Sequence, residues 1–308
     1  MVDSGLGLVL KSTGSWYEVL SDGECLQCRI RGKLRLKGVR STNPVVVGDW
    51  VRFETDEQGG YVISAIEPRR NYIIRRASNL SKESHIIAAN VDQALLVVTL
   101  FSPATATEFV DRFLVTCEAY KVPVTILLAK IDLAREHPEA VEEFHAIYES
   151  AGYKIVEVSA TEGDGVEEVR ELLRGKTTLL SGNSGVGKST LVAAVEQGLD
   201  IKTGEISQSH HKGKHTTTFS TMYPLAEGGY IIDTPGIKGF GLIDIEDAEL
   251  AHYFPEMMRF LPDCRFYNCS HTHEPGCAVV EAVKQGEIAY PRYESYLKIM
   301  DEDDKYRK

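Results

Sequence analysis

Residues 182–189, which read GNSGVGKS, have the residue types and spacing of a loop that binds nucleotide phosphates. They follow a short apolar run and precede a helical pattern, the context in which the motif G-x4-G-K-S/T is specific. The glycines let consecutive backbone N–H groups point at phosphate oxygens, Lys188 reaches the β- and γ-phosphates, and the Ser189 hydroxyl ligates Mg2+. A chance glycine-rich turn is the alternative. The residues expected to line the phosphates are Gly182, Asn183, Ser184, Gly185, Val186, Gly187, Lys188, Ser189 and Thr190.

A second phosphate-site motif, D-T-P-G at 233–236, follows the apolar run YII. We expect Asp233 to hold the water shell of the metal and the Gly236 N–H to contact the γ-phosphate, although D-x-P-G alone would be an ordinary turn. The segment 203–218 between the two motifs has almost nothing to bury, and its threonines can supply a second Mg2+ ligand. It is therefore interpreted as a switch loop ordered by the γ-phosphate, with a plain surface loop as the alternative.

Two further motifs lie upstream of the phosphate loop. AKID at 129–132 ends the apolar run VTILL and resembles the N-K-x-D sequence with which GTPases recognise guanine; Ser159 and Ala160 end the next such run and resemble the S-A loop that covers the base. Ordinary GTPases have these motifs after the phosphate loop. The order here predicts a circularly permuted α/β domain, in which every ligand loop still lies at the carboxyl ends of the strands.

The C-terminal region contains a cysteine and histidine cluster with the spacing C-x4-C-x-H-x5-C. Three thiolates and one imidazole suit tetrahedral Zn2+, and a closed set of four implies a structural site, with reduced free thiols as the alternative. The expected ligands are Cys264, Cys269, His271 and Cys277. His273 is the competing imidazole and is assigned to solvent or RNA. Cys25 and Cys28 are expected on opposite faces of a strand, as packing residues.

The 308 residues include 34 Lys and Arg against 45 Asp and Glu, a net charge of −11, which excludes a protein that coats nucleic acid by bulk attraction. An apolar fraction of 43% excludes wholesale disorder. No apolar run approaches the roughly 20 residues of a membrane span. The N-terminus lacks the basic start of a signal peptide, so we expect a cytoplasmic chain with six reduced cysteines.

The charge is unevenly distributed, because residues 1–70 hold 10 Lys and Arg against 9 Asp and Glu. The sequence CRIRGKLRLKGVR at 28–40 alternates basic with apolar residues, which predicts a strand with one basic face that contacts a phosphate backbone. A solvated surface strand is the alternative. The candidate RNA-binding residues are Arg29, Arg31, Lys33, Arg35 and Lys37.

Three domains are expected to position these motifs. Short strands in residues 1–70 predict a small all-β barrel, with 68–70 as a linker. The oligonucleotide-binding (OB) type suits the basic strand, and another small barrel is the alternative, because periodicity does not distinguish the two. Long apolar strands that alternate with helices predict an α/β domain over 71–242. Residues 243–308 are expected to form a small, mainly helical domain around the metal cluster. The expected strands are 16–20, 25–30, 49–53, 61–66, 91–100, 124–129, 153–158, 177–180 and 230–232, and the expected helices are 105–120, 138–151, 166–173, 189–197 and 247–259.

Taken together, these motifs resemble the circularly permuted ribosome-assembly GTPases, specifically the small-ribosomal-subunit-dependent GTPase A (RsgA) family. The resemblance covers nearly the whole chain and includes CRIRGKLR, AANVDQ, GKHTTT and CRFYNCSHTHEPGCAV. It implies an OB barrel, a permuted GTPase and a zinc domain that act late in maturation of the small ribosomal subunit. The implied partners are GTP and GDP, the subunit and its rRNA, without a membrane, for a chain that is monomeric off the ribosome.

The resemblance also implies residue roles. Lys130 and Asp132, with Ser159 and Ala160, surround guanine, although the family has Asn where this chain has Ala129. Thr217 matches the switch threonine that ligates Mg2+. Ile237 stands where Ras-like GTPases keep a water-orienting Gln, and His215 matches the histidine thought to replace it. The alternative is that His215 is one of three exposed loop histidines.

Two other functions stay open on the sequence. One is a nucleotide-gated RNA-binding or scaffolding factor whose hydrolysis is incidental, which weak nucleotide affinity caused by Ala129 would favour. The other is an RNA-linked ATPase or small-molecule kinase, against which Asp132 argues.

Overall fold

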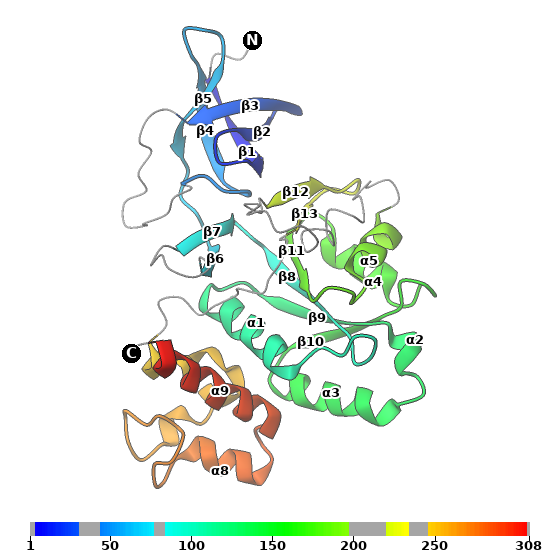
Figure 1. Ribbon diagram of the computed structural model, residues 1–308, viewed down its shortest axis with the longest axis vertical. Coiled ribbons are helices and arrows are strands. Elements are labelled where there is room, and N and C mark those ends of the chain that lie inside the picture. The colour runs from blue at the N-terminus through cyan, green and yellow to red at the C-terminus, as the bar shows by residue number, and fades with distance from the viewer. Residues whose placement is uncertain (1–3, 31–43, 77–83, 197–219, 234–245, 307–308) are drawn as a thin grey trace. The chain divides into compact units, whose positions relative to one another are not determined.

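The structure is a computed structural model that describes residues 4–30, 44–76, 84–196, 220–233 and 246–306. Figure 1 labels the helices and strands along the chain. The chain divides into two units. The first contains Met1–Ala94, Glu167–Ser181 and Lys188–Phe240, and the second contains Leu95–Val166, Gly182–Gly187 and Gly241–Lys308. The expected domain boundaries after residues 70 and 242 differ from this division and stay predictions.

The first unit begins with a closed barrel of five strands. These are β1 (Ser4–Ser12), β2 (Tyr17–Ser21), β3 (Glu24–Ile30), β4 (Trp50–Thr55) and β5 (Tyr61–Ile66). The strand order is β1-β2-β3-β5-β4, β1 pairs with β4 to close the barrel, and β3 and β5 run parallel. This arrangement confirms the expected OB-type barrel.

Strand β1 was not expected, because glycines weaken the sequence signal for a strand. Close packing explains why glycine occupies these positions. A Cβ on Gly7 would lie 2.4 Å from Cγ1 of Val19, and a Cβ on Gly5 would lie 2.7 Å from the ring of Phe53. The segment expected as a linker is also held in place. Arg69 forms a buried ion pair with Asp49, at 2.6 Å between Nε and Oδ1.

The rest of the first unit contains the hairpin β6 (Tyr72–Arg76) and β7 (Ser84–Ala89), and strands β11 (Thr177–Gly182), β12 (Thr221–Pro224) and β13 (Tyr230–Asp233). β13 runs parallel to β11 and antiparallel to β12, and β12 pairs with β1 of the barrel. The helices are α4 (Val166–Leu173) and α5 (Lys188–Val195). Neither the β6–β7 hairpin nor β12 was expected from the sequence.

The second unit contains neighbouring strands β8 (Gln93–Val98), β9 (Val124–Ala129) and β10 (Lys154–Val158), with helices α1 (Thr107–Ala119), α2 (Ile131–Ala134) and α3 (Pro138–Ser150). Every residue of β8 is buried, as expected of a strand covered on both faces. α3 packs against β10. These elements confirm the alternating α/β pattern, with ends within two residues of most expected bounds.

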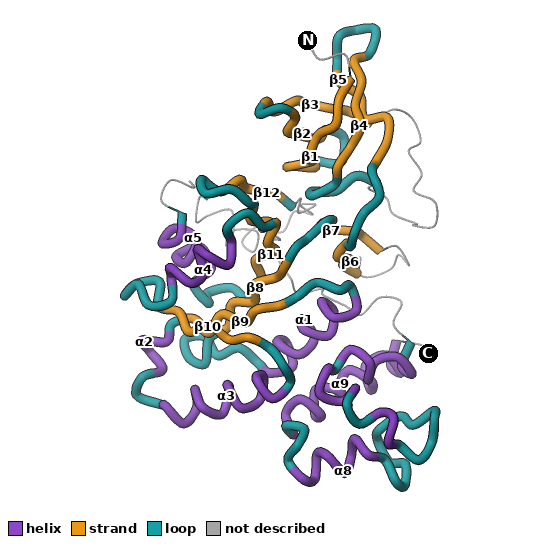
Figure 2. Tube along the Cα trace, turned by 180° about the vertical axis from the view of Figure 1, so that it is seen from behind, coloured by secondary structure: helices purple, strands orange, loops and turns teal. Residues whose placement is uncertain are grey.

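The C-terminal segment consists of helices and loops over its described residues (Figure 2). Its elements are η2 (Asp247–Tyr253), α7 (Pro255–Met258), η3 (Leu261–Asp263), α8 (Ala278–Gln285) and α9 (Tyr290–Tyr306). The single helix expected over 247–259 is wrong: a 3₁₀ helix ends before Phe254, which is extended at φ −112° and ψ 97°. Pro255 explains the break, because the residue before a proline avoids the α-helical conformation.

The C-terminal segment packs on α1 through one apolar core and one buried ion cluster. Val115 of α1 shares the core with Phe254, Met257 and Tyr296. Arg292 of α9, which is 0% exposed, donates to Asp111 of α1 at 2.8 Å and to Glu256 of α7 at 2.7 and 3.1 Å. Three aromatic rings surround its guanidinium at 4.9–5.8 Å: Phe254, Tyr153 and Tyr148.

None of the helices in the described part of the chain is both long enough and apolar enough to cross a bilayer.

Arg292→Met should lower the free energy of unfolding of the second unit by about 3–5 kcal/mol, because it leaves two buried carboxylates without their cation. Lys298→Ala is the matched control: Lys298 lies on the same helix, is 51% exposed and pairs with Glu294, so we expect a loss below about 1 kcal/mol. Urea denaturation is followed by circular dichroism of the helices, since the two tryptophans, Trp16 and Trp50, both lie in or beside the barrel. Equal losses in the two variants would contradict the assignment.

Candidate functional site

The two motifs expected to recognise guanine, AKID at 129–132 and Ser159-Ala160, are called the base-reading motifs below, and they follow neighbouring parallel strands of the second unit. β9 and β10 are in register with Ala129 opposite Val158, so both strands end at the same edge. Lys130 follows β9 directly, and Asp132 lies half-buried in the first turn of α2. The structure therefore brings the AKID and S-A motifs to one edge of the sheet.

Lys130 joins the base-reading motif to the phosphate loop. Its backbone is left-handed, at φ 55° and ψ 42°. Its ammonium donates to the backbone carbonyl of Gly185 in the phosphate loop at 2.8 Å, and to that of Ser102 at 2.5 Å. Two motifs more than fifty residues apart are thus held together by one cation. Ser102, in the loop before α1, was missed by sequence reasoning, because a backbone carbonyl carries no residue-type signal.

The phosphate loop has the backbone that its glycines permit. Gly182, Gly185 and Gly187 have positive φ of 145°, 85° and 99°, a region that side chains disfavour. At Gly182 a Cβ would lie 2.3 Å from the carbonyl oxygen of Val97. Val186 is fully buried and anchors the loop. The loop is therefore shaped by close backbone packing in the second unit.

The remaining phosphate-site residues that are described belong to the first unit. Lys188, Ser189 and Thr190 form the first turn of α5, where a helix favours anions. Asp233 is the last residue of β13 and is in register with Leu180 of the parallel strand β11. The phosphate loop and the first turn of α5 follow the carboxyl end of β11, and Asp233 lies at the carboxyl end of β13. A nucleotide site in an α/β sheet requires residues at these ends.

Ser159 organises the loop that follows β10. It is fully buried, and its hydroxyl lies 3.1 Å from that of Thr161 and accepts from the Glu162 N–H at 3.3 Å. Arg135, just after α2, forms ion pairs with Glu162 at 2.6 Å and with Asp164 at 2.5 Å. Ala160 lies half-buried within this loop. The Arg135 contacts tie the two base-reading segments together, and sequence reasoning missed them.

Several expected site residues lie outside the described part of the chain. They are His215, Thr217 and Gly236 of the switch segments, and Arg31, Lys33, Arg35 and Lys37 of the basic run. Arg29 is described: it is exposed on β3, and its guanidinium lies 4.1 Å from the centroid of the Trp16 ring. Trp16, which is also exposed, was missed, because it precedes β2 and only the pairing of β2 with β3 brings it next to Arg29.

The four expected metal ligands come together in the C-terminal segment. One ligand atom from each of Cys264, Cys269, His271 and Cys277 lies within 4.8 Å of the others. His271 Nδ1 is 3.6 Å from the sulfurs of Cys264 and Cys277. A tetrahedral Zn2+, with bonds of about 2.3 Å to sulfur and about 2.0 Å to nitrogen, separates these atoms by about 3.6 Å. The cluster can therefore hold a metal ion, and its dimensions fit zinc.

Glu274, which sequence reasoning missed, shapes the loop between the metal ligands. Its carboxylate accepts from the hydroxyl and N–H of Ser270, at 2.6 and 2.7 Å, and from the N–H groups of Thr272 and His273. Burial opposes its ionisation, but these hydrogen bonds outweigh burial and lower the pKa of Glu274. His273 is exposed and lies outside the ligand cluster, as expected.

The two cysteines of the barrel, Cys25 and Cys28, differ in burial. Cys28 is buried on one face of β3, and burial raises the pKa of its thiol to about 11. Cys25 is exposed on the opposite face. The opposite faces were expected, but the packing role assigned to Cys25 is wrong because its side chain is in contact with solvent.

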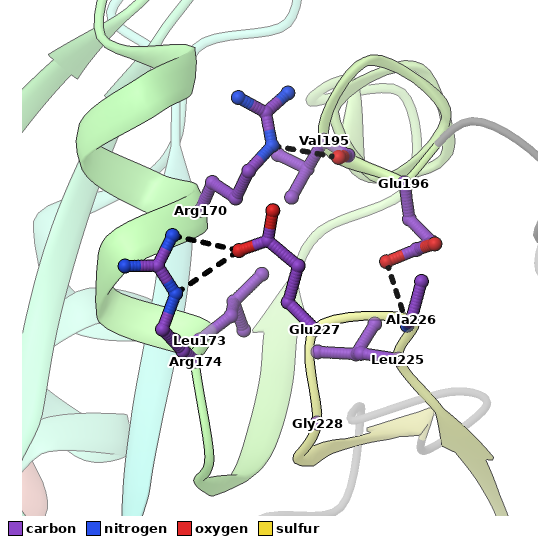
Figure 3. Close-up of a pocket in the computed structure, with 9 residues that line it drawn as sticks. All are labelled: Arg170, Leu173, Arg174, Val195, Glu196, Leu225, Ala226, Glu227 and Gly228. Carbon is purple, nitrogen blue, oxygen red and sulfur yellow. Dashed lines mark hydrogen bonds and ion pairs between the residues drawn. The ribbon is translucent and has the colours of Figure 1, made fainter.

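The first unit contains a cavity of about 360 Å3, whose lining residues are drawn in Figure 3. It is bordered by α4, the end of α5 and the β12–β13 turn. Its two arginines are already paired: Arg170 donates to the carbonyl of Val195, and Arg174 to the carboxylate of Glu227. The cavity contains none of the residues that the motifs select, so the loops, and not this cavity, mark the candidate site.

Comparison with known proteins identifies relatives over the whole chain. A family model described as RsgA GTPase matches residues 66–243, and one described as RsgA N-terminal domain matches residues 6–63. The small ribosomal subunit biogenesis GTPase RsgA of Bacteroides fragilis is 53% identical over 305 residues, which cover 98% of each chain. That of Porphyromonas gingivalis is 53% identical over 308 residues, again 98% of each.

Solved structures give the same result. The crystal structure of YjeQ from Thermotoga maritima has a TM-score of 0.76 and 37% identity, covering 97% of this chain and 98% of the other. YloQ, described as a circularly permuted GTPase, has a TM-score of 0.71 and 29% identity, covering 99% and 96%. The permuted order predicted from the motifs is confirmed.

We expect the purified protein to contain about one zinc ion per chain, and His271→Ala to reduce this to well below half, because three thiolates leave the tetrahedral set incomplete. Plasma mass spectrometry of the dialysed protein measures the metal. His273→Ala and Cys25→Ser are matched controls and should keep their zinc. Loss of zinc from His273→Ala, with retention in His271→Ala, would reverse the ligand assignment.

Proposed function

The chain belongs to the RsgA GTPase family, and from that premise we propose that it hydrolyses GTP while bound to the maturing small ribosomal subunit and its rRNA. Family membership and the permuted fold make it a GTP-hydrolysing enzyme. The observation that carries the site is the double contact of Lys130, which holds the base-reading motif against the phosphate loop. The names of the relatives support the ribosomal partner.

Guanine recognition is assigned to Asp132, with Lys130, Ser159 and Ala160 around the base. A carboxylate accepts hydrogen bonds from the N1 and N2 donors of guanine, which adenine does not present in that pattern. Ala129 has no amide group with which to support the base or the phosphate loop. Asp132 therefore supplies most of the discrimination between guanine and adenine.

The phosphates are assigned to the loop from Gly182 to Thr190 and to Gly236. Mg2+ would be held by the hydroxyls of Ser189 and Thr217 and, through water, by Asp233, an all-oxygen donor set of the kind that it prefers. When bound, it neutralises charge on the β- and γ-phosphates. Lys188 adds a fixed positive charge where negative charge accumulates during transfer.

Hydrolysis needs a group that orients water, and Ile237 cannot do so. We assign this role to His215, whose imidazole can accept a hydrogen bond from the attacking water. The water oxygen bonds to the γ-phosphorus as the bond to the β,γ-bridging oxygen breaks, which yields GDP and inorganic phosphate. Thr217 and Lys188 hold the reacting phosphate in place.

RNA contact is assigned to the basic run that starts at Arg29, next to the exposed ring of Trp16. The metal centre is assigned to zinc with a structural role, and we propose a cytoplasmic chain that is monomeric off the ribosome. Ala129 favours one alternative, a nucleotide-gated RNA-binding scaffold with incidental hydrolysis. An effect of the subunit on the hydrolysis rate separates the two.

Single-turnover GTP hydrolysis should accelerate at least about tenfold when purified small subunits are added, because we propose that the subunit acts on the switch segment 203–218, which contains His215 and Thr217. Released phosphate is measured with enzyme in excess, and large subunits are the control. An unchanged rate, with binding to subunits verified by co-sedimentation, would reject the coupled enzyme in favour of the scaffold.

Asp132→Asn should weaken GTP binding by about 10-fold to 100-fold, because a charge-assisted hydrogen bond contributes about 1.5–3 kcal/mol. The same variant should gain affinity for xanthosine triphosphate, whose O2 accepts a hydrogen bond from an amide. Competition against a fluorescent GDP measures both affinities. Glu136→Gln, an exposed carboxylate just after the same helix, should change neither. Unaltered guanine preference in Asp132→Asn would exclude Asp132 as the base-reading residue.

A further inference from the structure

Helix α9 contacts the metal loop with two tyrosines. The Tyr293 hydroxyl donates to the carbonyl of His271 at 2.8 Å, and the Tyr296 hydroxyl donates to the carbonyl of Ser270 at 2.7 Å. Both tyrosines are buried and their rings are stacked. His271 has a positive φ of 56°, a conformation that a side chain adopts only when its surroundings enforce it. The metal and the tyrosines together can enforce it.

The same turn of α9 also holds α1. Arg292, adjacent to Tyr293, places its fully buried guanidinium between Asp111 of α1 and Glu256 of α7. The ring of Tyr296 packs edge-on against Phe254, at 5.5 Å between centroids. A shift of this turn would therefore move a buried charge away from its partners. Such a displacement is costly, so α1 and the metal loop are held in a fixed relation.

α1 in turn begins at the loop that contacts the nucleotide site. The Thr99 hydroxyl donates to the carbonyl of Pro103 at 2.5 Å, and the N–H of Thr105 donates to the carbonyl of Thr99 at 2.8 Å. The carbonyl of Ser102, within this loop, accepts from Lys130, which also reaches Gly185 of the phosphate loop. Every contact in this series lies within the second unit.

We propose that the metal site and the nucleotide site are energetically coupled through α9 and α1, with Tyr293 and Tyr296 as positioning residues. Metal binding fixes the backbone at Ser270 and His271, the two tyrosines transfer this restraint to α9, and Arg292 transfers it to α1. The loop around Ser102 then holds Lys130 in the position that guanine binding requires. The inference rests on the proposed nucleotide site and adds a linkage to it.

Thermodynamic linkage makes the effect reciprocal: if metal raises the affinity for nucleotide by a given factor, nucleotide raises the affinity for metal by the same factor. Zinc affinity is measured at equilibrium by competition with a chromophoric chelator, with and without saturating GDP. In the unaltered protein we expect GDP to tighten zinc binding at least about fivefold. Fluorescent GDP should bind the zinc-loaded protein more tightly than the zinc-depleted protein by a similar factor.

The double variant Tyr293→Phe/Tyr296→Phe keeps both rings and every metal ligand but removes the hydroxyls that reach the metal loop. We expect it to bind zinc, as measured by metal analysis, while the GDP effect falls to below about twofold. Tyr290→Phe is the matched control, because Tyr290 lies on the same helix and is 62% exposed. That variant should keep the full effect.

The possible results are distinct. The absence of a GDP effect on zinc affinity in the unaltered protein would overturn the proposal. A full GDP effect on zinc affinity in the double variant would also overturn the proposal. That result is expected if zinc and GDP are linked only because loss of zinc unfolds the whole chain, since such a link would not need the two tyrosine hydroxyls. If the zinc-loaded protein bound no GDP, the proposed function itself would be contradicted, and the coupling with it.

Discussion

The buried guanidinium of Arg292 is the interaction on which the second unit depends. Removing an ion from water costs several kcal/mol, and this arginine is 0% exposed. Two carboxylates from different helices, Asp111 and Glu256, compensate for the cost, and three aromatic faces add cation–π attraction. Because no single helix supplies the cluster, each of α1, α7 and α9 requires the other two to be in place. The ion cluster thus specifies one relative position of α1, α7 and α9, because any other position would separate the buried charges.

Circular permutation is compatible with this site because the site depends on strand ends and not on chain order. The residues proposed to recognise guanine follow β9 and β10, whose parallel register aligns Ala129 with Val158. The phosphate loop follows β11, and Asp233 ends the parallel strand β13. Each ligand loop therefore lies at the carboxyl end of its strand, whichever strand the chain forms first. Lys130 connects the loop after β9 to the phosphate loop by a direct hydrogen bond to the Gly185 carbonyl, although the two loops are far apart in the sequence.

The sequence predicted what local chemistry determines. The phosphate loop, the permuted order, the OB-type barrel and the four metal ligands follow from residue types at fixed spacing, and the buried parallel strands follow from their apolar runs. It failed where long-range packing overrides local preference. The glycines of β1 lower the strand propensity of its sequence. They are needed because the side chains of Val19 and Phe53, from neighbouring strands, lie too close to leave room for a Cβ. Arg69 could not be assigned to Asp49 without the fold. One local signal was also overlooked: the helix expected over 247–259 ignored the effect of Pro255 on the preceding residue, Phe254.

The sequence also did not predict residues that contribute a backbone group to the site or that hold other site residues in place. The carbonyl of Ser102, the ion pairs of Arg135 and the hydrogen bonds of Glu274 have no motif, because any residue can offer a carbonyl and acidic residues are common. The exposed pair of Trp16 and Arg29 was missed for a similar reason, because the pairing of β2 with β3 brings the two residues together.

The pairing of β1 with β12, at Lys11 opposite Thr221, has a consequence for the edge of the sheet in the first unit. β12 would otherwise be an edge strand, with a row of N–H and C=O groups open to any extended chain. The first strand of the barrel occupies that edge. A chain that has lost β1 would therefore leave β12 unpaired on that side, next to β13, the strand that ends at Asp233.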